Sequence, residues 1–159
     1  MSYNKKYNLD AQYFFGELEQ ERLYETLMLF RDVFMEFDSP DYTAEGIDEF
    51  LKFLEPLNIT EMLDESKMRI WTCCCNGCVV GALAAEKNHI NLLFVDGMHH
   101  RKGIARRLLE IMINSYNPKV ISVNSSPYAV KAYQKLGFNE TAAEQFENGI
   151  RFIPMKKNF

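Results

Sequence analysis

The stretch H-I-N-L-L-F-V-D-G-M-H-H-R-K-G-I-A, from His89 to Ala105, predicts a strand, a short polar loop and the first turn of a helix. Its first half, residues 90–95, is mostly apolar, as in a strand that is covered on both faces. From Gly103 on, apolar residues recur every three or four positions, which indicates a helix that packs back on the sheet. The stretch therefore predicts a strand–loop–helix unit of an α/β fold.

The loop of this unit predicts a binding site for an anion. The first amides of a helix have no partner within the helix, so they are free to bind a negatively charged group that lies before it. Gly103 and Ala105 leave the backbone bare enough for a phosphate to approach it closely. Three neighbouring side chains are cationic or can become so: His100, Arg101 and Lys102.

A second segment, residues 124–138, predicts another strand–loop–helix unit. A strand ends near its start, Pro127 suits the first turn of a helix, and Gly137 suits the end of that helix. The helix carries Ala129 and, four residues later, Tyr133.

Both segments resemble the coenzyme A-binding motifs of the GNAT superfamily of N-acetyltransferases. The first is similar to the phosphate-binding motif Gln/Arg-x-x-Gly-x-Gly/Ala, with His100 in the place where Gln or Arg is usual. The second is similar to the family's other coenzyme A segment, with Ser126 in a place where Asn is frequent. The resemblance covers about residues 68–155 and implies a GNAT-like fold with acetyl-coenzyme A as the cofactor.

Carried over residue by residue, the resemblance implies two catalytic groups. The backbone amide of Val95, freed by a bulge in its strand, would hold the negative charge that develops on the thioester oxygen. Tyr133 would donate a proton to the departing thiolate. The residues that the resemblance implies in cofactor binding are Phe94, Val95, His100, Arg101, Lys102, Gly103, Ile104, Ala105, Arg106, Asn124, Ser126, Ala129 and Tyr133.

The base that takes the proton of the acceptor amine stays open at this point. His89 begins its strand where several relatives carry a catalytic glutamate, and an imidazole with an ordinary pKa of about 6.5 can accept a proton. Glu86 is an alternative. A water molecule is another, and an amine that binds already deprotonated needs no dedicated base.

In the family the acceptor lies against the first two helices and the last hairpin. Aromatic and acidic groups close together suit a cation, such as a small amine, a polyamine, a lysine side chain or a peptide N-terminus. The sequence identifies neither the acceptor nor whether an acyl group other than acetyl is used. The residues expected to bind the acceptor are Phe30, Phe34, Asp38 and Tyr42.

The rest of the chain alternates between helical and strand patterns. Helices are expected over residues 17–37 and 43–54, with Thr43 as the N-cap of the second, Pro56 as its terminator, and one short turn opened by Thr60. Further helices follow Gly103 and Pro127. Strands are expected over residues 68–75, 78–86, 89–95, 119–123, 143–146 and 150–155.

This order predicts a single N-acetyltransferase domain over residues 1–159, of the α/β class. Its central sheet should be mixed, with helices on both faces, and the strands that flank the helix after Gly103 should be parallel. A Rossmann domain fits worse, because its G-x-G-x-x-G motif follows the first strand, whereas this glycine follows a hairpin.

Length and composition narrow the class of protein. A chain of 159 residues with 47% hydrophobic content suits one well-buried domain. Its formal charge of −4 argues against a nucleic-acid surface. No segment has the length of a membrane span and the start lacks the core of a signal peptide. We expect a cytoplasmic protein, a monomer or homodimer, with an amine substrate and without a nucleic-acid or membrane partner.

The four cysteines all lie within residues 73–78. Asn76 and Gly77 predict a tight hairpin turn, which places the first three cysteines on one strand with alternating directions. Adjacent strand residues cannot converge on one ion, and no second cysteine pair completes a zinc site. We therefore expect no metal, and buried reduced thiols instead.

The leading functional hypothesis is an N-acetyltransferase that moves an acetyl group from acetyl-coenzyme A to a primary amine by direct attack. The alternative is a non-catalytic coenzyme A-binding sensor or regulatory module that keeps the cofactor cleft. Binding of acetyl-coenzyme A without thiol release across a broad amine panel would favour the module.

Overall fold

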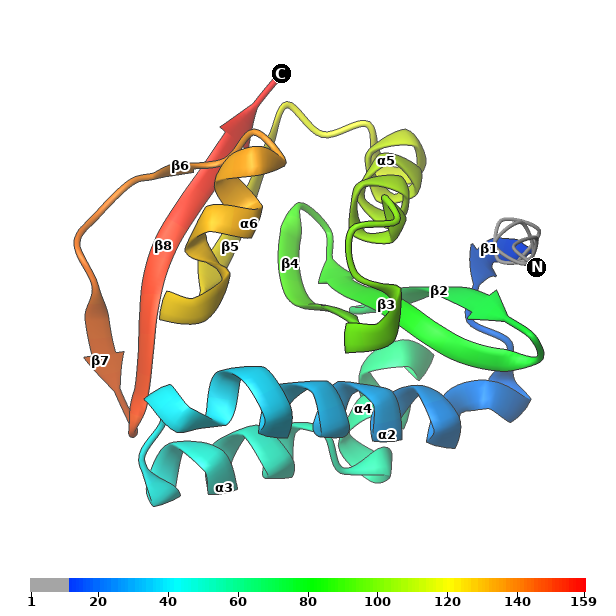
Figure 1. The fold of residues 1–159 in the computed structure, drawn as a ribbon, viewed down its shortest axis with the longest axis horizontal. Helices are drawn as coiled ribbons and strands as arrows, with labels where there is room; N and C mark the ends of the chain where they lie inside the picture. Colours follow the sequence, from blue (N-terminus) through cyan, green and yellow to red (C-terminus); the bar gives the residue numbers. More distant parts are fainter. Residues whose placement is uncertain (1–11) are drawn as a thin grey trace, which may run out of the picture.

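A computed structural model describes residues 12–159 of the chain. Eight strands form a mixed sheet in the order β1-β2-β3-β4-β5-β8-β6, with β7 paired to β8 (Figure 1). Only β4 and β5 pair in parallel among the described strands. The strands are β1 Tyr13–Glu17, β2 Arg69–Cys75, β3 Cys78–Glu86, β4 His89–Val95, β5 Val120–Ser125, β6 Asn139–Glu140, β7 Gln145–Glu147 and β8 Ile150–Asn158.

Helices cover both faces of this sheet, as predicted (Figure 1). On one face α2 (Leu23–Val33), α3 (Ala44–Phe53) and α4 (Pro56–Asp64) bury a core that includes Phe30 and Ile59. On the other face α5 (Ile104–Tyr116) and α6 (Val130–Lys135) bury a core around Leu108. Among residues 12–159, no helix combines the length and the apolar character that crossing a membrane requires.

The strands predicted over residues 78–86 and 89–95 are confirmed with the same bounds. Thr43 is the N-cap of α3, because its hydroxyl accepts the Gly46 amide at 3.1 Å. The prediction that Pro56 only terminates a helix is incomplete, since it also begins α4. A proline costs nothing at the first position of a helix, where the missing N–H has no partner in any case.

The helix predicted to begin at residue 17 begins later. Residues 13–17 form β1 instead, and α2 starts at Leu23 after one 3-10 turn. Tyr13 and Phe15 lie opposite Cys75 and Cys73 on β2, so contact with that strand decides the conformation. This pairing joins segments about sixty residues apart, which a local pattern does not reveal.

The parallel pair β4 and β5 positions the functional cleft. The two strands pair only at His89–Ser122 and Ile90–Val123, and then they diverge. On its other side β4 skips Asn91 in the register with β3, because Leu92 pairs with Ala84 and Ile90 with Ala85. A residue left out of the ladder is a β-bulge, which bends its strand. The strand therefore carries a bulge, and the sheet opens beyond it.

The cysteine hairpin has the predicted turn, with positive φ angles of 54° at Asn76 and 79° at Gly77. All four cysteines are free. Cys73 and Cys75 are buried, Cys74 is half-buried and Cys78 is exposed, so the expectation that all are buried is wrong for Cys78. Cys78 begins β3 directly after the turn, at the end of the β2–β3 ladder, where it pairs with Cys75.

Replacing both Cys75 and Cys78 with serine is expected to preserve acetyl transfer and bound metal content while lowering stability. The cost should be about 1–3 kcal/mol and should come from Cys75, because it places a hydroxyl in an apolar site. Cys78→Ser alone is the control and should be nearly neutral. Urea denaturation and metal analysis would measure both. Stoichiometric zinc that is lost in the double variant would contradict the expectation.

Candidate active site

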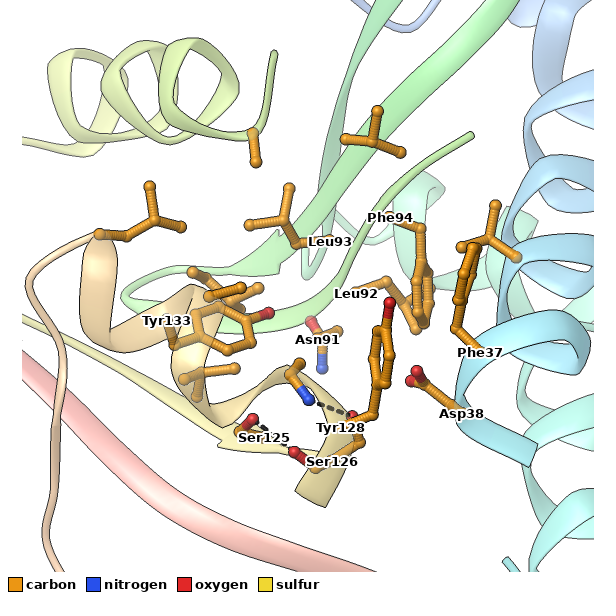
Figure 2. Close-up of a pocket in the computed structure, with 18 of the residues that line it drawn as sticks. Phe37, Asp38, Asn91, Leu92, Leu93, Phe94, Ser125, Ser126, Tyr128 and Tyr133 are labelled. Carbon is orange, nitrogen blue, oxygen red and sulfur yellow. Dashed lines mark hydrogen bonds between the residues drawn. The ribbon is translucent and has the colours of Figure 1, made fainter. Parts of the chain in front are cut away.

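The opening between β4 and β5 is a cleft with a volume of about 1060 Å³. Its walls come from β4, β5, the end of α2, the start of α5 and the segment from Ser126 through α6 (Figure 2). The cleft has a basic end and an acidic end. Arg101, Arg106, Lys131 and Lys135 line it near the start of α5, whereas Asp38 and Glu49 line it near α2 and α3.

The basic end lies at the N-terminus of α5, a helix of thirteen residues. Gly103 caps this helix in a left-handed conformation, with φ of 80°. A Cβ atom built at Gly103 would meet no heavy atom within 4 Å, so the space beside this backbone is open. Unpaired helix amides, an open approach and four basic side chains fit the diphosphate of coenzyme A.

Two histidines organise the loop that precedes this helix. His100 Nε2 lies 2.8 Å from the Val95 carbonyl oxygen, which can only accept, so Nε2 carries the proton. The same ring lies 5.2 Å from the ring of Phe37. His99 Nδ1 hydrogen-bonds the Tyr13 hydroxyl at 2.9 Å. Both side chains therefore hold the loop against neighbouring elements.

The amides of β4 that face the cleft follow from the strand's hydrogen bonds. The Asp96 N–H donates to the Val80 carbonyl of β3 at 2.8 Å. In an antiparallel pair every second amide points to the same neighbour, so the Phe94 amide also faces β3. The amides of Leu93 and Val95 face the other way, into the cleft. The sequence named Val95 as an amide donor and missed Leu93.

The segment between β5 and α6 places several predicted residues on the cleft. Ser126 is buried, and its hydroxyl oxygen accepts the Ala129 amide at 3.2 Å, so it caps the turn that begins α6. Asn124 is exposed and also lines the cleft. Tyr128, which the sequence did not single out, stands on the opposite side of this segment with about half of its side chain exposed.

Tyr133 lies in the middle of the cleft, with its hydroxyl pointing into it (Figure 2). Its ring is 7% exposed and packs edge-on against Phe138 at 5.4 Å. Burial, with a contribution from the charge of Asp38, holds the pKa of this phenol well above its ordinary value. Tyr133 therefore keeps its proton throughout the neutral range.

Asp38 ends the helical segment that follows α2, and its carboxylate points into the cleft (Figure 2). The side chain is 7% exposed. Burial raises the pKa of this carboxyl from 3.8 to about 7, the Ser126 side chain opposes that rise, and Asp41 adds to it. Tyr42 lies close by, and burial together with Asp38 and Asp41 raises its pKa to about 12.

The raised pKa of Asp38 predicts a pH-dependent effect on stability. Below about pH 4 the carboxyl is neutral in both the folded and unfolded protein, and it costs nothing. Between about pH 4 and 7 the carboxyl ionises in the unfolded protein but keeps its proton in the folded one, so stability falls as the pH rises, and above about pH 7 the full cost of about 2–4 kcal/mol is reached. Asp38→Asn should therefore raise the free energy of unfolding at pH 8 by about this amount. Urea denaturation would show it, and equal effects at pH 4 and 8 would contradict it.

His89 lies at the closed end of the cleft, where β4 and β5 still pair. Its Nδ1 is 2.8 Å from the Ser122 hydroxyl oxygen. Burial lowers the pKa of the imidazole, and the charge of Glu86 opposes this. Val95 lies six positions after His89 on the strand, which amounts to roughly 20 Å of extended chain. These two predicted catalytic residues therefore lie at opposite ends of β4.

Four residues were predicted to bind the acceptor, and only Asp38 and Tyr42 line the cleft. Phe30 and Phe34 are fully buried. The Phe30 ring packs 6.0 Å from that of Phe94, and Phe34 stacks on Phe50 at 3.7 Å. Both rings thus support the wall of the cleft from behind. Within residues 12–159, no three His, Cys, Asp or Glu side chains are arranged to hold a metal ion.

The mixed sheet that opens at its parallel pair beside a helix N-terminus has the same fold as solved acetyltransferases. The family model of the GNAT acetyltransferase domain matches residues 38–159, so the chain belongs to this family.

Individual relatives agree with this family. The chain is 28% identical over 82 residues to an uncharacterized N-acetyltransferase, YafP, of Escherichia coli K12, a match that covers 52% of this chain and 53% of that protein. A GCN5-related N-acetyltransferase structure from Rhodopseudomonas palustris has a TM-score of 0.78 at 16% identity, covering 94% and 97% of the two chains. The PaiA N-acetyltransferase from Thermoplasma acidophilum, solved with coenzyme A, has a TM-score of 0.71 at 16% identity, covering 93% and 99%.

Proposed function

We propose that this protein transfers the acetyl group of acetyl-coenzyme A to a primary amine by direct attack of the amine on the thioester. The observation that carries the proposal is the polarity of the cleft between β4 and β5. One end has helix amides and basic side chains, the other has buried and aromatic groups with a carboxylate, and a protonated phenol lies between them. A phosphate-bearing donor and a cationic acceptor would therefore meet beside Tyr133.

The donor would bind along β4 and the start of α5. The amides at the start of α5 would hold its diphosphate, with Arg101 and Arg106 adding positive charge. Arg106 is already oriented, because its guanidinium donates to the Lys135 carbonyl at 3.0 Å. When bound, the donor supplies an activated acetyl group as a thioester. Phe94 and Val95 would line the pantetheine part, with Asn124, Ser126 and Ala129 across the cleft.

The backbone of β4 would stabilise the charge of the transition state. The amides of Val95 and Leu93 point into the cleft and have no partner on β5, because the two strands have diverged there. An amide that donates to the oxygen on which charge develops is worth about 3–4 kcal/mol. We assign this role to Val95, with Leu93 as the second amide of the same face.

Tyr133 would supply the proton that the departing sulfur needs. Its phenol is protonated over the neutral range and points into the cleft. The burial that raises the pKa of the phenol also raises the proton affinity of a thiolate that leaves into the same space. The donation therefore remains feasible although the phenol is a weaker acid than in water.

A thiol-release assay of acetyl-coenzyme A against a panel of amines, aminoglycosides and peptides would test the proposal. We expect release of free coenzyme A in step with formation of an acetylated amine detected by mass spectrometry. Tight binding of acetyl-coenzyme A without release for any acceptor would favour the binding module instead.

The free cysteines support a reducing compartment such as the cytoplasm.

A further inference from the structure

The segment that carries Asp38 has an unusual backbone. Residues Phe34–Asp38 form a π-helical turn directly after α2, and a 3-10 turn with Pro40 follows it. Such π turns are rare and occur frequently at functional sites, because they redirect the side chains of a helix. Here the turn brings both Phe37 and Asp38 onto the cleft wall (Figure 2).

Asp38 is a buried carboxylate without a cation. More than nine-tenths of its side chain is buried, and no Lys, Arg or His among residues 12–159 forms an ion pair with it. The groups that face it are Asp41 and Tyr42 from the following turn, Ser126 and Tyr128 from the β5–α6 segment, and Tyr133 from α6. None of these side chains is positively charged at neutral pH.

A carboxylate in this position is costly unless a ligand compensates it. Burying an unpaired charge costs several kcal/mol. The protonated, neutral form of the carboxyl is therefore favoured, and its pKa rises. Burial raises the pKa of Asp38 to about 7, which is near the value that suits a base at neutral pH. A cationic acceptor would supply the missing positive charge.

The position of Asp38 relative to Tyr133 indicates what it would do with that cation. The two side chains point into the cleft from opposite sides, α6 and the end of α2, with β4 behind them (Figure 2). The two side chains lie close enough to each other that the charge of Asp38 raises the pKa of Tyr133. An amine that attacks a thioester held along β4 would therefore have the phenol on one side and the carboxylate on the other.

We propose that Asp38 is the catalytic base of this transferase: it binds the acceptor as an ammonium ion and takes one of its protons. This rests on the proposed acetyl transfer. The stacked rings of Phe37 and Tyr128, 5.4 Å apart, stand beside the carboxylate as an aromatic wall for the cation. Asp38 accepts the first N–H proton, the nitrogen forms the C–N bond, and the C–S bond breaks. The sulfur takes a proton from Tyr133, and the second N–H proton restores that phenol.

The other candidate bases fit this geometry less well. His89 is tied to Ser122 at the closed end of the cleft. The carboxylate of Glu86 accepts a hydrogen bond from the side-chain amide of Asn91 at 2.9 Å. Glu86 also belongs to β3, which is not part of the cleft lining. Neither faces Tyr133 across the space where the amine must attack. Asp38 does, from the end of the helical segment that follows α2 (Figure 2).

The test measures kcat/KM against pH for ethylamine, 2-fluoroethylamine and 2,2-difluoroethylamine, which are nearly the same size and successively less basic. If Asp38 is the base, the wild-type rate should rise through an acid limb near pH 7 that is the same for all three amines. At higher pH the rate should fall, and the midpoint of this fall should follow the pKa of each amine, because the ammonium form is the one that binds. If instead the amine enters already neutral, the rate should only rise with pH, through the pKa of each amine, without the shared limb near pH 7.

Two variants complete the test. Asp38→Asn keeps the size of the side chain but cannot accept a proton, so it should abolish the limb near pH 7. It should also lower kcat/KM for ethylamine by roughly 10²–10⁴-fold, and the loss should shrink for the difluoro amine, which needs a base least. Asp32→Asn is the control on α2, because Asp32 is exposed and paired with Arg31 away from the cleft. It should behave as wild type.

The outcomes separate this inference from the proposed function. Wild-type protein that acetylates none of the probes and no amine of the broader panel would contradict the proposed function and the role of Asp38 with it. Active wild-type protein without an amine-independent limb near pH 7 would overturn the role of Asp38 alone, and this result needs no variant. A folded Asp38→Asn protein with the wild-type rate and profile would do the same.

Discussion

Replacing Tyr133 with phenylalanine is expected to lower kcat and kcat/KM together, by roughly 10²–10⁴-fold. The substitution removes only the hydroxyl, so the ring should still pack on Phe138 and the fold should persist. The phenol acts when the C–S bond breaks, which is in the transition state, so affinity for acetyl-coenzyme A should stay nearly constant. Steady-state kinetics and calorimetric titration would separate these quantities.

Tyr116→Phe is the matched control for this prediction. Tyr116 is a partly buried tyrosine at the end of α5, where its ring packs edge-on to Trp71 at 5.8 Å, outside the cleft. Loss of the Tyr116 hydroxyl should leave the rate of acetyl transfer unchanged. Because the pKa of Tyr133 is raised, its ionisation should not limit the rate of the wild-type protein at moderately alkaline pH. A Tyr133→Phe protein that turns over at the wild-type rate, with chemistry rate-limiting, would remove Tyr133 from the mechanism.

Gly103→Val should weaken the binding of acetyl-coenzyme A by about 10²-fold. The branched side chain would extend into the open space beside the α5 amides and keep the diphosphate from them. Losing one or two charge-assisted hydrogen bonds, at about 1.5–3 kcal/mol each, accounts for this magnitude. Calorimetric titration of the folded variant would measure it.

The valine also imposes backbone strain at Gly103, and a control must share that strain. Gly77→Val provides it, because Gly77 has a φ of 79° against 80° for Gly103, and a Cβ at either position meets no heavy atom within 4 Å. Gly77 lies in the cysteine hairpin, outside the cleft. Gly77→Val should therefore lose stability but keep its affinity. Equal affinities of the Gly103 variant and wild type would show that the diphosphate binds elsewhere.

The sequence by itself determined the unit from β4 to α5 and the helix that carries Tyr133. These segments depend on local signals, namely apolar periodicity, a glycine where the backbone turns left-handed, and a proline at a helix start. The hairpin turn at Asn76 and Gly77 and the N-cap at Thr43 were also predictable, because each is made within a few residues. The same signals carried the family resemblance.

Only the tertiary structure decided which faces of these elements meet the cleft. Phe34 and Phe37 lie on one apolar stripe in the sequence, yet Phe34 is buried in the core and Phe37 lines the cleft, because the π-helical turn changes the phase of the helix between them. Strand β1 is likewise set by its pairing with β2.

The same holds for the chemistry of the site. An aspartate two residues before a proline is usually a solvated loop residue, and nothing in its neighbours along the chain shows that Asp38 is buried. Burial in the folded protein raises its pKa, and Ser126, which partly opposes that rise, lies about ninety residues further along the chain. Burial and electrostatic coupling depend on distances in space, whereas helix, strand and turn signals depend on spacing in sequence. The cofactor loop was therefore visible in the sequence, and the acceptor side of the cleft required the fold.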